Sequence, residues 1–192
     1  LREVLIRMVY CEMLGVPVPF AYVTALSATQ EAKTSEKKVA YICASLCLRG
    51  VGEWSVLATN SLRRDLENSS ILDQWAALGA LSALVTRETA PALIDPTCAL
   101  LQHSRALIRK WSVHAIGHFI ALHEHVISED SMAVEEELEA GHALWSKLLA
   151  ALYDKDPSVM MAVVSVLQPL VTKYGARFSS KTRRELLSAL TA

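Results

Sequence analysis

Apolar residues return at every third or fourth position along most of the chain, which is the spacing of amphipathic α-helices. One such stripe consists of Val39, Ile42, Cys43, Leu46 and Cys47, and a longer one consists of Leu107, Ile108, Trp111, Ala115 and Phe119. No segment alternates apolar and polar residues with the period of two that a strand requires. The pattern therefore predicts an all-α chain of about ten helices, arranged as five antiparallel pairs.

Residues that start or stop helices separate these stripes. Gly15 should end the first helix, because glycine tolerates the backbone conformation at a helix C-terminus. Ser69 or Ser70 should cap the start of the helix Ile71–Val85. Asp156 should cap the helix that begins at Pro157, a proline in the favoured first turn. Pro96 should split its segment or begin a new helix there. The loops between helices are then short.

The segment Leu101–Ile116 contains the end of one helix, a polar turn and the start of the next, and this pattern recurs. Similar segments begin near Leu66 and Leu152, so the helix pair repeats about every 35 residues, apart from one insertion. Such a repeat predicts an α-solenoid of HEAT or armadillo type. We expect Trp75 and Trp111, which occupy matching positions, to be largely buried between neighbouring helix pairs.

We expect residues 1–192 to form a single α-solenoid segment that is an excerpt of a longer domain, since Leu1 already stands in helical register. The insertion is an acidic loop near residues 124–140, and it includes the run Glu135–Glu139. It is either a solvated surface loop or short exposed helix, or a docking loop for a partner. Long loops between helices cost little entropy, so the pattern leaves both interpretations open.

Composition narrows the function classes. Hydrophobic residues make up 52% of the chain, which excludes a disordered polypeptide, and a net charge of -1 provides no bulk attraction to nucleic acid. The most apolar uncharged run, residues 157–172, is shorter than the roughly 20 residues of a membrane-spanning helix. The four cysteines lie within apolar helical patterns, so we expect buried free thiols rather than disulfides or a zinc site: Cys11, Cys43, Cys47 and Cys98.

Histidines form the one cluster with conceivable metal chemistry: His114, His118, His123 and His125. His114 and His118 are one helical turn apart, as two zinc ligands on a helix would be. However, no glutamate follows His114, and no cysteine or aspartate stands nearby to complete the ligand set. The chain also lacks a Gly-x-Ser-x-Gly motif and a glycine-rich phosphate loop. We therefore predict no metal, no cofactor, no catalytic residue and no enzymatic activity, and the residues that bind partners stay open.

Basic residues gather near the predicted turns, at Arg63–Arg64, Arg105, Arg109–Lys110 and Lys181–Arg184. The simpler interpretation is a set of solvated helix ends, with Arg109–Lys110 pairing with an acidic turn. The alternative is a surface for anionic lipid or for the acidic face of a partner. Aromatic residues that would stack on bases are not interleaved with these cations, so we expect no nucleic-acid binding.

Several longer stretches carry a specific resemblance. They occur in one order along the chain: Arg7–Gly15 followed by Phe20–Tyr22, then Ser35–Tyr41, then Asn60–Leu66, then Leu101–Ser104 leading to Ile108–Lys110. In this order they resemble the amino-terminal trunk of the large adaptin subunits of clathrin-type adaptor complexes. Their residues are most similar to those of the epsilon type of the fourth adaptor complex. Alpha-type adaptins have a phosphoinositide-binding lysine run at the position of residues 1–3, where only Arg2 matches, so that site is not expected here.

The resemblance implies a non-enzymatic scaffold in vesicle-mediated intracellular protein transport. Its implied partners are the small and medium adaptor subunits, the second large adaptin subunit and a GTP-loaded Arf-family GTPase. The implied location is cytoplasmic, peripheral on trans-Golgi network or endosomal membranes as part of a membrane coat. The alternative is another HEAT or armadillo solenoid, such as a nuclear-transport or nucleic-acid-associated scaffold. The cargo cannot be deduced.

Overall fold

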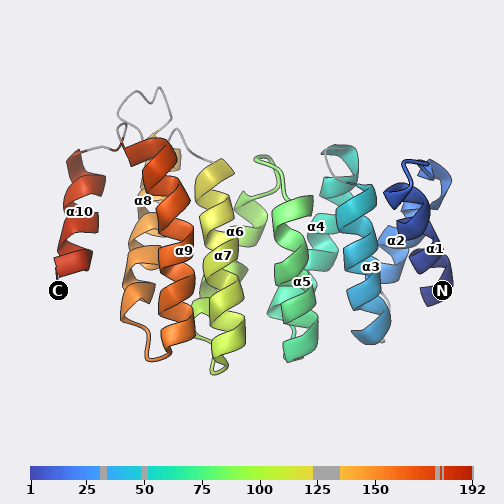
Figure 1. The fold of residues 1–192 in the computed structure, drawn as a ribbon, viewed down its shortest axis with the longest axis horizontal. Coiled ribbons are helices and arrows are strands. Elements are labelled where there is room, and N and C mark those ends of the chain that lie inside the picture. The colour runs from blue at the N-terminus through green and yellow to red at the C-terminus, as the bar shows by residue number, and fades with distance from the viewer. Residues whose placement is uncertain (31–33, 49–51, 123–134, 176–177, 179, 192) are drawn as a thin grey trace. The chain divides into compact units, whose positions relative to one another are not determined.

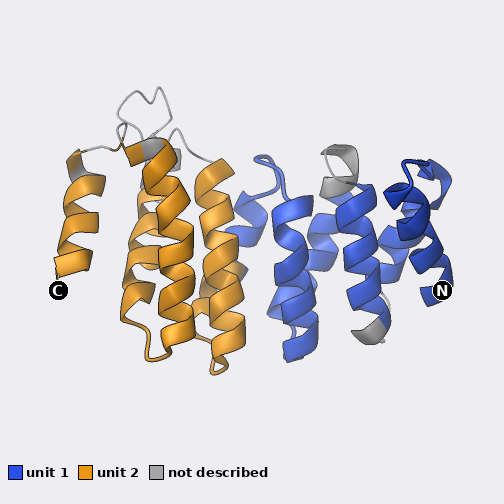
Figure 2. Ribbon diagram, viewed as in Figure 1, with its two compact units in different colours: residues 1–96 blue, residues 97–192 orange. Residues whose placement is uncertain are grey.

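The computed structural model of the chain describes residues 1–30, 34–48, 52–122, 135–175, 178 and 180–191 (Figure 1). Every regular element in these ranges is helical, and ten of the elements are α-helices. The predicted all-α solenoid class is therefore confirmed. The chain divides into two compact units, Leu1–Pro96 and Thr97–Ala192, which are coloured separately in Figure 2.

The first unit is built from helices that pack in two layers. Helix α3 contacts α1, α2 and α5, while α4 packs against α5 and touches α2. Neighbouring helices thus form the pairs α2–α3 and α4–α5; the repeat that begins near Leu66 predicted the second of these pairs. The elements are α1 (Arg2–Met13), the 3₁₀ turn η1 (Pro19–Ala21), α2 (Tyr22–Thr29), α3 (Thr34–Cys47), α4 (Gly52–Glu67), α5 (Ile71–Leu84) and α6 (Pro91–Ala99), which crosses into the second unit.

The second unit repeats this arrangement. Helix α7 packs along α9 and contacts α8, and α10 packs on α8. The elements are η2 (Leu100–Gln102), α7 (Ala106–Leu122), α8 (Glu135–Ala150), η4 (Ala151–Tyr153), α9 (Pro157–Tyr174) and α10 (Ser180–Thr191).

Several predicted helix ends have the expected local chemistry. Gly15 follows α1 with a φ of 78°, a left-handed conformation that side-chain-bearing residues avoid. The Ser70 hydroxyl accepts a hydrogen bond from the backbone N–H of Asp73, and the Asp156 carboxylate accepts one from the N–H of Ser158. These caps satisfy amide groups that the first helical turn leaves without a partner.

One predicted boundary is wrong. Helix α6 runs through Pro96 instead of splitting there, since a proline in a short helix removes only one intrahelical hydrogen bond. Helix α8 begins at Glu135, so the last part of the acidic segment at 124–140 is helical, which is one of the forms that the sequence pattern left open. Glutamate favours helix formation, and its negative charge suits the positive end of the helix dipole. The rest of that loop, up to residue 134, lies outside the described residues.

The prediction that the two matching tryptophans are largely buried is confirmed only in part. Trp75 and Trp111 are half-buried, and Lys38 Nζ lies 4.2 Å from the centroid of the Trp75 ring. Trp145 on α8 is fully buried, and its ring meets Phe178 edge-to-face at 5.4 Å. A position shared by two repeats indicates the same helix register, but the neighbouring helix decides how deeply a large ring is covered.

Helices α7 and α9 approach each other closely at Gly117. A methyl group at this buried glycine would collide with the Val166 side chain of α9. Gly79 on α5 is different, because a methyl group there would meet nothing within 4 Å. Of these two glycines, packing therefore requires Gly117 and leaves room for a side chain at Gly79.

Candidate functional site

Two histidines of the cluster, His114 and His118, lie among the described residues, and neither belongs to a group of metal ligands there. His114 is exposed, with its ring 6.2 Å from that of Trp111, and His118 is half-buried. Partial burial and the charge of Lys110 lower the pKa of His114. His123 and His125 lie outside the described residues. Among the residues with described positions, no three His, Cys, Asp or Glu side chains are grouped as metal ligands would be.

All four cysteines are free thiols, as predicted; three are buried, and Cys11 is half-buried. Cys43 and Cys47 stand one turn apart on α3 with their sulfur atoms 3.8 Å apart. Burial raises the pKa of both thiols, that of Cys47 to about 12. Neither is a thiolate near neutral pH, so neither has the character of a nucleophile.

A buried ionic cluster joins three helices of the first unit. Lys37 Nζ of α3 lies 2.9 Å from Asp65 Oδ1 of α4 and 3.4 Å from Asp73 Oδ2 of α5. The Tyr41 hydroxyl donates to the other Asp65 oxygen at 2.8 Å. Burial, followed by the charge of Asp65, raises the pKa of Tyr41. Asn68 also donates to Asp73 Oδ2, at 3.2 Å.

This cluster explains two of the sequence stretches that carried the resemblance. Lys37 and Tyr41 belong to the stretch Ser35–Tyr41, and Asp65 belongs to Asn60–Leu66. All three residues are buried, each at most 5% exposed. Removing one partner of such a pair leaves a buried charge without compensation, so these residue types must be kept together. The cluster has a structural role, and the sequence pattern did not predict it.

Glu12, from another of those stretches, holds the turn between α1 and α2. Its Oε1 accepts hydrogen bonds from the backbone N–H of Val18 and from the Tyr22 hydroxyl, both at 3.1 Å. Burial and this hydrogen bond raise the pKa of Tyr22. Glu12 and Gly15 thus set the geometry of this turn.

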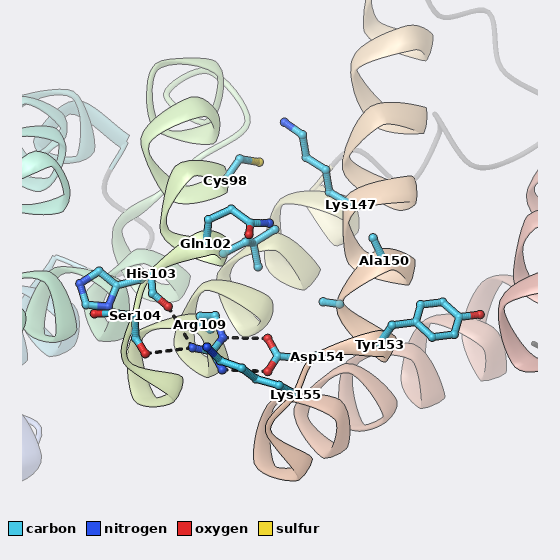
Figure 3. A pocket seen from close by; sticks show the side chains of 12 residues that line it. Cys98, Gln102, His103, Ser104, Arg109, Lys147, Ala150, Tyr153, Asp154 and Lys155 are labelled. Atoms are coloured by element: carbon cyan, nitrogen blue, oxygen red, sulfur yellow. Dashed lines mark hydrogen bonds and ion pairs between the residues drawn. The ribbon is translucent and has the colours of Figure 1, made fainter.

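An arginine–aspartate pair joins two consecutive helix pairs of the second unit (Figure 3). Arg109 Nε and Nη2 donate to the two oxygens of Asp154 at 2.7 and 2.8 Å. Arg109 Nη1 donates to the carbonyl oxygens of His103 and Ser104. The hydrogen bond from Arg109 lowers the pKa of Asp154. The predicted pairing of Arg109 with an acidic turn is confirmed.

A cleft of about 520 Å³ opens beside this pair. One wall is formed by the end of α6 and by η2, with Leu101 and Gln102, and the other by α8 and η4, with Lys147 and Ala151. In Figure 3, Lys147 reaches from α8 toward Cys98, while Tyr153 points away from the cleft. The cleft contains no constellation of nucleophile, base and acid.

The other predicted basic groups behave mostly as solvated helix ends. Arg63 pairs with Glu67 one turn along α4 at 3.1 Å, and both side chains are more than half exposed. Arg64 lies 3.7 Å from Asp65, and Arg184 is exposed on α10. The Arg63–Glu67 pair, with both side chains in solvent, contributes little to stability.

Each unit also presents large apolar side chains to solvent. On α2 and α4 they include Val23, 56% exposed, and Leu57, 59% exposed. On the neighbouring helices α7 and α9 they include Leu107, Met161 and Val164, of which Met161 is 68% exposed. Exposed apolar side chains that gather on one layer of a solenoid are typical of protein-binding surfaces.

The helical pairs, the buried polar links between them and the exposed apolar layers together define an α-solenoid interaction protein. The profile of the family described as "Adaptin N terminal region" matches residues 2–191, so the chain belongs to this family. This membership supports the prediction of a structural, non-enzymatic subunit. None of the helices in the described ranges is long and apolar enough to cross a membrane.

Curated relatives include subunits of two adaptor complexes. The chain is 34% identical over 173 residues to the AP-4 complex subunit epsilon of Dictyostelium discoideum, and 27% identical over 182 residues to the human AP-4 complex subunit epsilon-1. It is 26% identical over 167 residues to the AP-3 complex subunit delta-1 of Bos taurus. These alignments cover 90, 95 and 87% of the chain but only 15, 15 and 13% of the relatives.

Two solved structures have the same fold. A homology model of the full-length AP-3 complex in an intermediate open conformation matches with a TM-score of 0.75 and 25% identity, over 99% of this chain and 30% of that one. A designed armadillo repeat protein in complex with the peptide (KR)4 matches with a TM-score of 0.54 and 16% identity, over 87% of this chain and 79% of that one. The second likeness concerns the solenoid fold alone.

Proposed function

We propose that the chain is part of the trunk of an epsilon-like large adaptin and acts as a scaffold of a vesicle-coat adaptor complex. Its family membership and its AP-4 and AP-3 relatives support this role. The chain spans about 15% of the length of the AP-4 relatives, so the partners are inferred for the longer protein. They are the small and medium adaptor subunits, the second large subunit and a GTP-loaded Arf-family GTPase.

The observation that carries the proposal is the exposed apolar layer of α7 and α9. Met161 and Val164 stand on the solvent side of α9, and Leu107 stands on that of α7. Removing an apolar side chain of this size from water is favourable by about 1.5–3 kcal/mol. A protein that covers this layer therefore gains binding free energy from each buried side chain. Methionine adapts its shape to irregular surfaces. We assign this layer to the small adaptor subunit.

Coexpression tests the assignment. The chain and the matching small subunit should purify as a soluble one-to-one complex, whereas the chain alone should aggregate. A Met161→Asp, Val164→Asp variant should lose the complex, because two carboxylates cannot be buried without partners. Gln168→Asp, at an exposed polar position of α9, is the matched control and should keep it. Equal binding by all three proteins would exclude this layer as the contact surface.

A pull-down from a lysate of the source organism tests the wider role. Mass spectrometry should identify small and medium adaptor subunits. Binding of the GTP-loaded Arf-family GTPase should be weak until the second large subunit is added, since we expect both large subunits to share that surface. On this proposal the protein is cytoplasmic and peripheral on trans-Golgi network or endosomal membranes. Recovery of ribonucleoproteins or import cargo without any adaptor subunit would contradict it.

A further inference from the structure

We propose that the cleft beside the Arg109–Asp154 pair binds an extended acidic peptide segment. The site consists of the walls that α6 with η2 and α8 with η4 form in the second unit. Its volume of about 520 Å³ lies within the roughly 300–1,000 Å³ that ligand pockets occupy. This inference goes beyond the proposed scaffold role.

The charged residues of the cleft determine whether it favours a positively or a negatively charged ligand. Asp154 is the acidic residue among those that line the cleft, and the bidentate contact with Arg109 neutralises it. Lys147 and Lys155 remain, both exposed, and neither forms an ion pair within the part of the chain that the structure describes. A concave surface with two uncompensated cations concentrates anionic ligands.

The walls between these lysines suit a peptide. Leu101, Ala150 and Ala151 provide an apolar lining, and the exposed Gln102 amide can both donate to and accept from a peptide backbone. In an extended segment, alternate side chains point in opposite directions, with a repeat of about 6.6 Å. Acidic side chains can then reach the lysines while the apolar ones between them lie on the wall.

Other anionic ligands fit less well. Phosphate groups favour an arginine fork or a helix N-terminus. Here the Arg109 fork is occupied by Asp154 and two carbonyl groups, and the Asp156 side chain caps the start of α9. The aromatic side chain at the cleft, Tyr153, points away and donates to the carbonyl oxygen of Ala189, so it offers no platform for a nucleic-acid base (Figure 3).

Fluorescence anisotropy of a labelled peptide tests the proposal. The probe is a fluorescein-labelled hexapeptide of alternating Glu and Leu, and its control has Gln in place of every Glu. The 192-residue chain is kept soluble as a fusion to maltose-binding protein, and circular dichroism checks the folding of each variant. The acidic peptide should bind at least ten times more tightly than the Gln peptide. Raising the salt concentration should weaken its binding several-fold.

Charge reversal locates the site. A Lys147→Glu, Lys155→Glu variant should weaken binding of the acidic peptide at least tenfold. Arg184→Glu reverses an exposed cation of the same unit outside the cleft and should change the affinity less than twofold. Equal losses in both variants would indicate general attraction to a basic surface and would overturn the proposal.

A second arm separates a peptide from a membrane. Vesicles of phosphatidylcholine with one-fifth phosphatidylserine should bind the Lys147→Glu, Lys155→Glu variant as well as they bind the unchanged chain. If the vesicles bind only the unchanged chain and the acidic peptide binds neither protein, the ligand of the cleft is a lipid headgroup and the proposal is wrong. No adaptor subunit is present in either arm, so the result does not depend on the proposed scaffold role.

Discussion

Replacing Arg109 by methionine should strongly destabilise the second unit. The change keeps most of the side-chain volume but removes two hydrogen bonds to Asp154 and two to backbone carbonyl groups. The Arg109 and Asp154 side chains are 6% and 13% exposed, so water cannot fully replace the lost contacts. Removing one partner of a buried pair costs about 3–5 kcal/mol. Asp154 keeps a hydrogen bond from the N–H of Asp156 at 2.8 Å, so we expect about 3 kcal/mol.

Smaller changes to this pair should lower the free energy of unfolding by less, in an order that the geometry predicts. Arg109→Lys keeps the charge but loses the planar fork that matches the carboxylate, and should cost about 1–2 kcal/mol. Asp154→Asn keeps the oxygen that accepts from Asp156 but loses the acceptor for Arg109 Nε, and should cost about 2 kcal/mol. The double variant should cost less than the sum of the single ones, because both remove the same interaction.

Acidification should weaken the same contact. The pKa of Asp154 is lowered in the folded chain, chiefly by the hydrogen bond from Arg109. Its contribution to stability is therefore fully present above the unfolded pKa of about 4, and it is lost as the pH falls through the lower folded value. The unchanged chain should lose more stability than Arg109→Met when the pH is lowered from 5 to 3.

Urea unfolding of the maltose-binding protein fusion, followed by circular dichroism, measures these free energies after subtraction of the carrier's own transition. Arg63→Met is the control, since Arg63 pairs with Glu67 at the surface, and it should cost less than about 0.5 kcal/mol. If Arg109→Met lowers the free energy of unfolding by less than about 1 kcal/mol, the contact between the helix pairs is not strong. The same conclusion follows if the losses of Arg109→Met and Asp154→Asn simply add in the double variant.

Three further changes test the packing and the buried charges, each measured by the same unfolding experiment. Asp65→Asn should cost about 2–4 kcal/mol, because it removes the carboxylate shared by a buried lysine and a buried tyrosine hydroxyl; a neutral result would show that water enters the cluster. Gly117→Ala should cost about 1–3 kcal/mol through the collision with α9, whereas Gly79→Ala should stabilise by about 0.5–1 kcal/mol, and the same sign for both would disprove the close approach. Trp145→Ala should cost about 3–5 kcal/mol and Trp111→Ala clearly less, since only Trp145 is fully buried; the reverse order would place the core elsewhere.

The sequence by itself determined the helical class and most helix ends. The apolar period predicted most α-helical regions, and Gly15, Ser70 and Asp156 act at the boundaries where they were expected. These features depend on hydrogen bonds between residues two to four positions apart, so a short stretch of sequence contains all the information. The repeat and the ordered stretches that resemble adaptins were also sufficient to predict the family that the profile confirms.

Tertiary structure decided the contacts between distant residues. Lys37 meets Asp65 across 28 positions, and Arg109 meets Asp154 across 45. The sequence indicated an acidic partner for Arg109 but no partner for Lys37, and it gave no sign of the cleft that Lys147 and Lys155 line. The burial of Trp145 rather than Trp111 follows the same rule. Helical periodicity shows which face of a helix is apolar, but only the packing of neighbouring helices decides how far each side chain is removed from water.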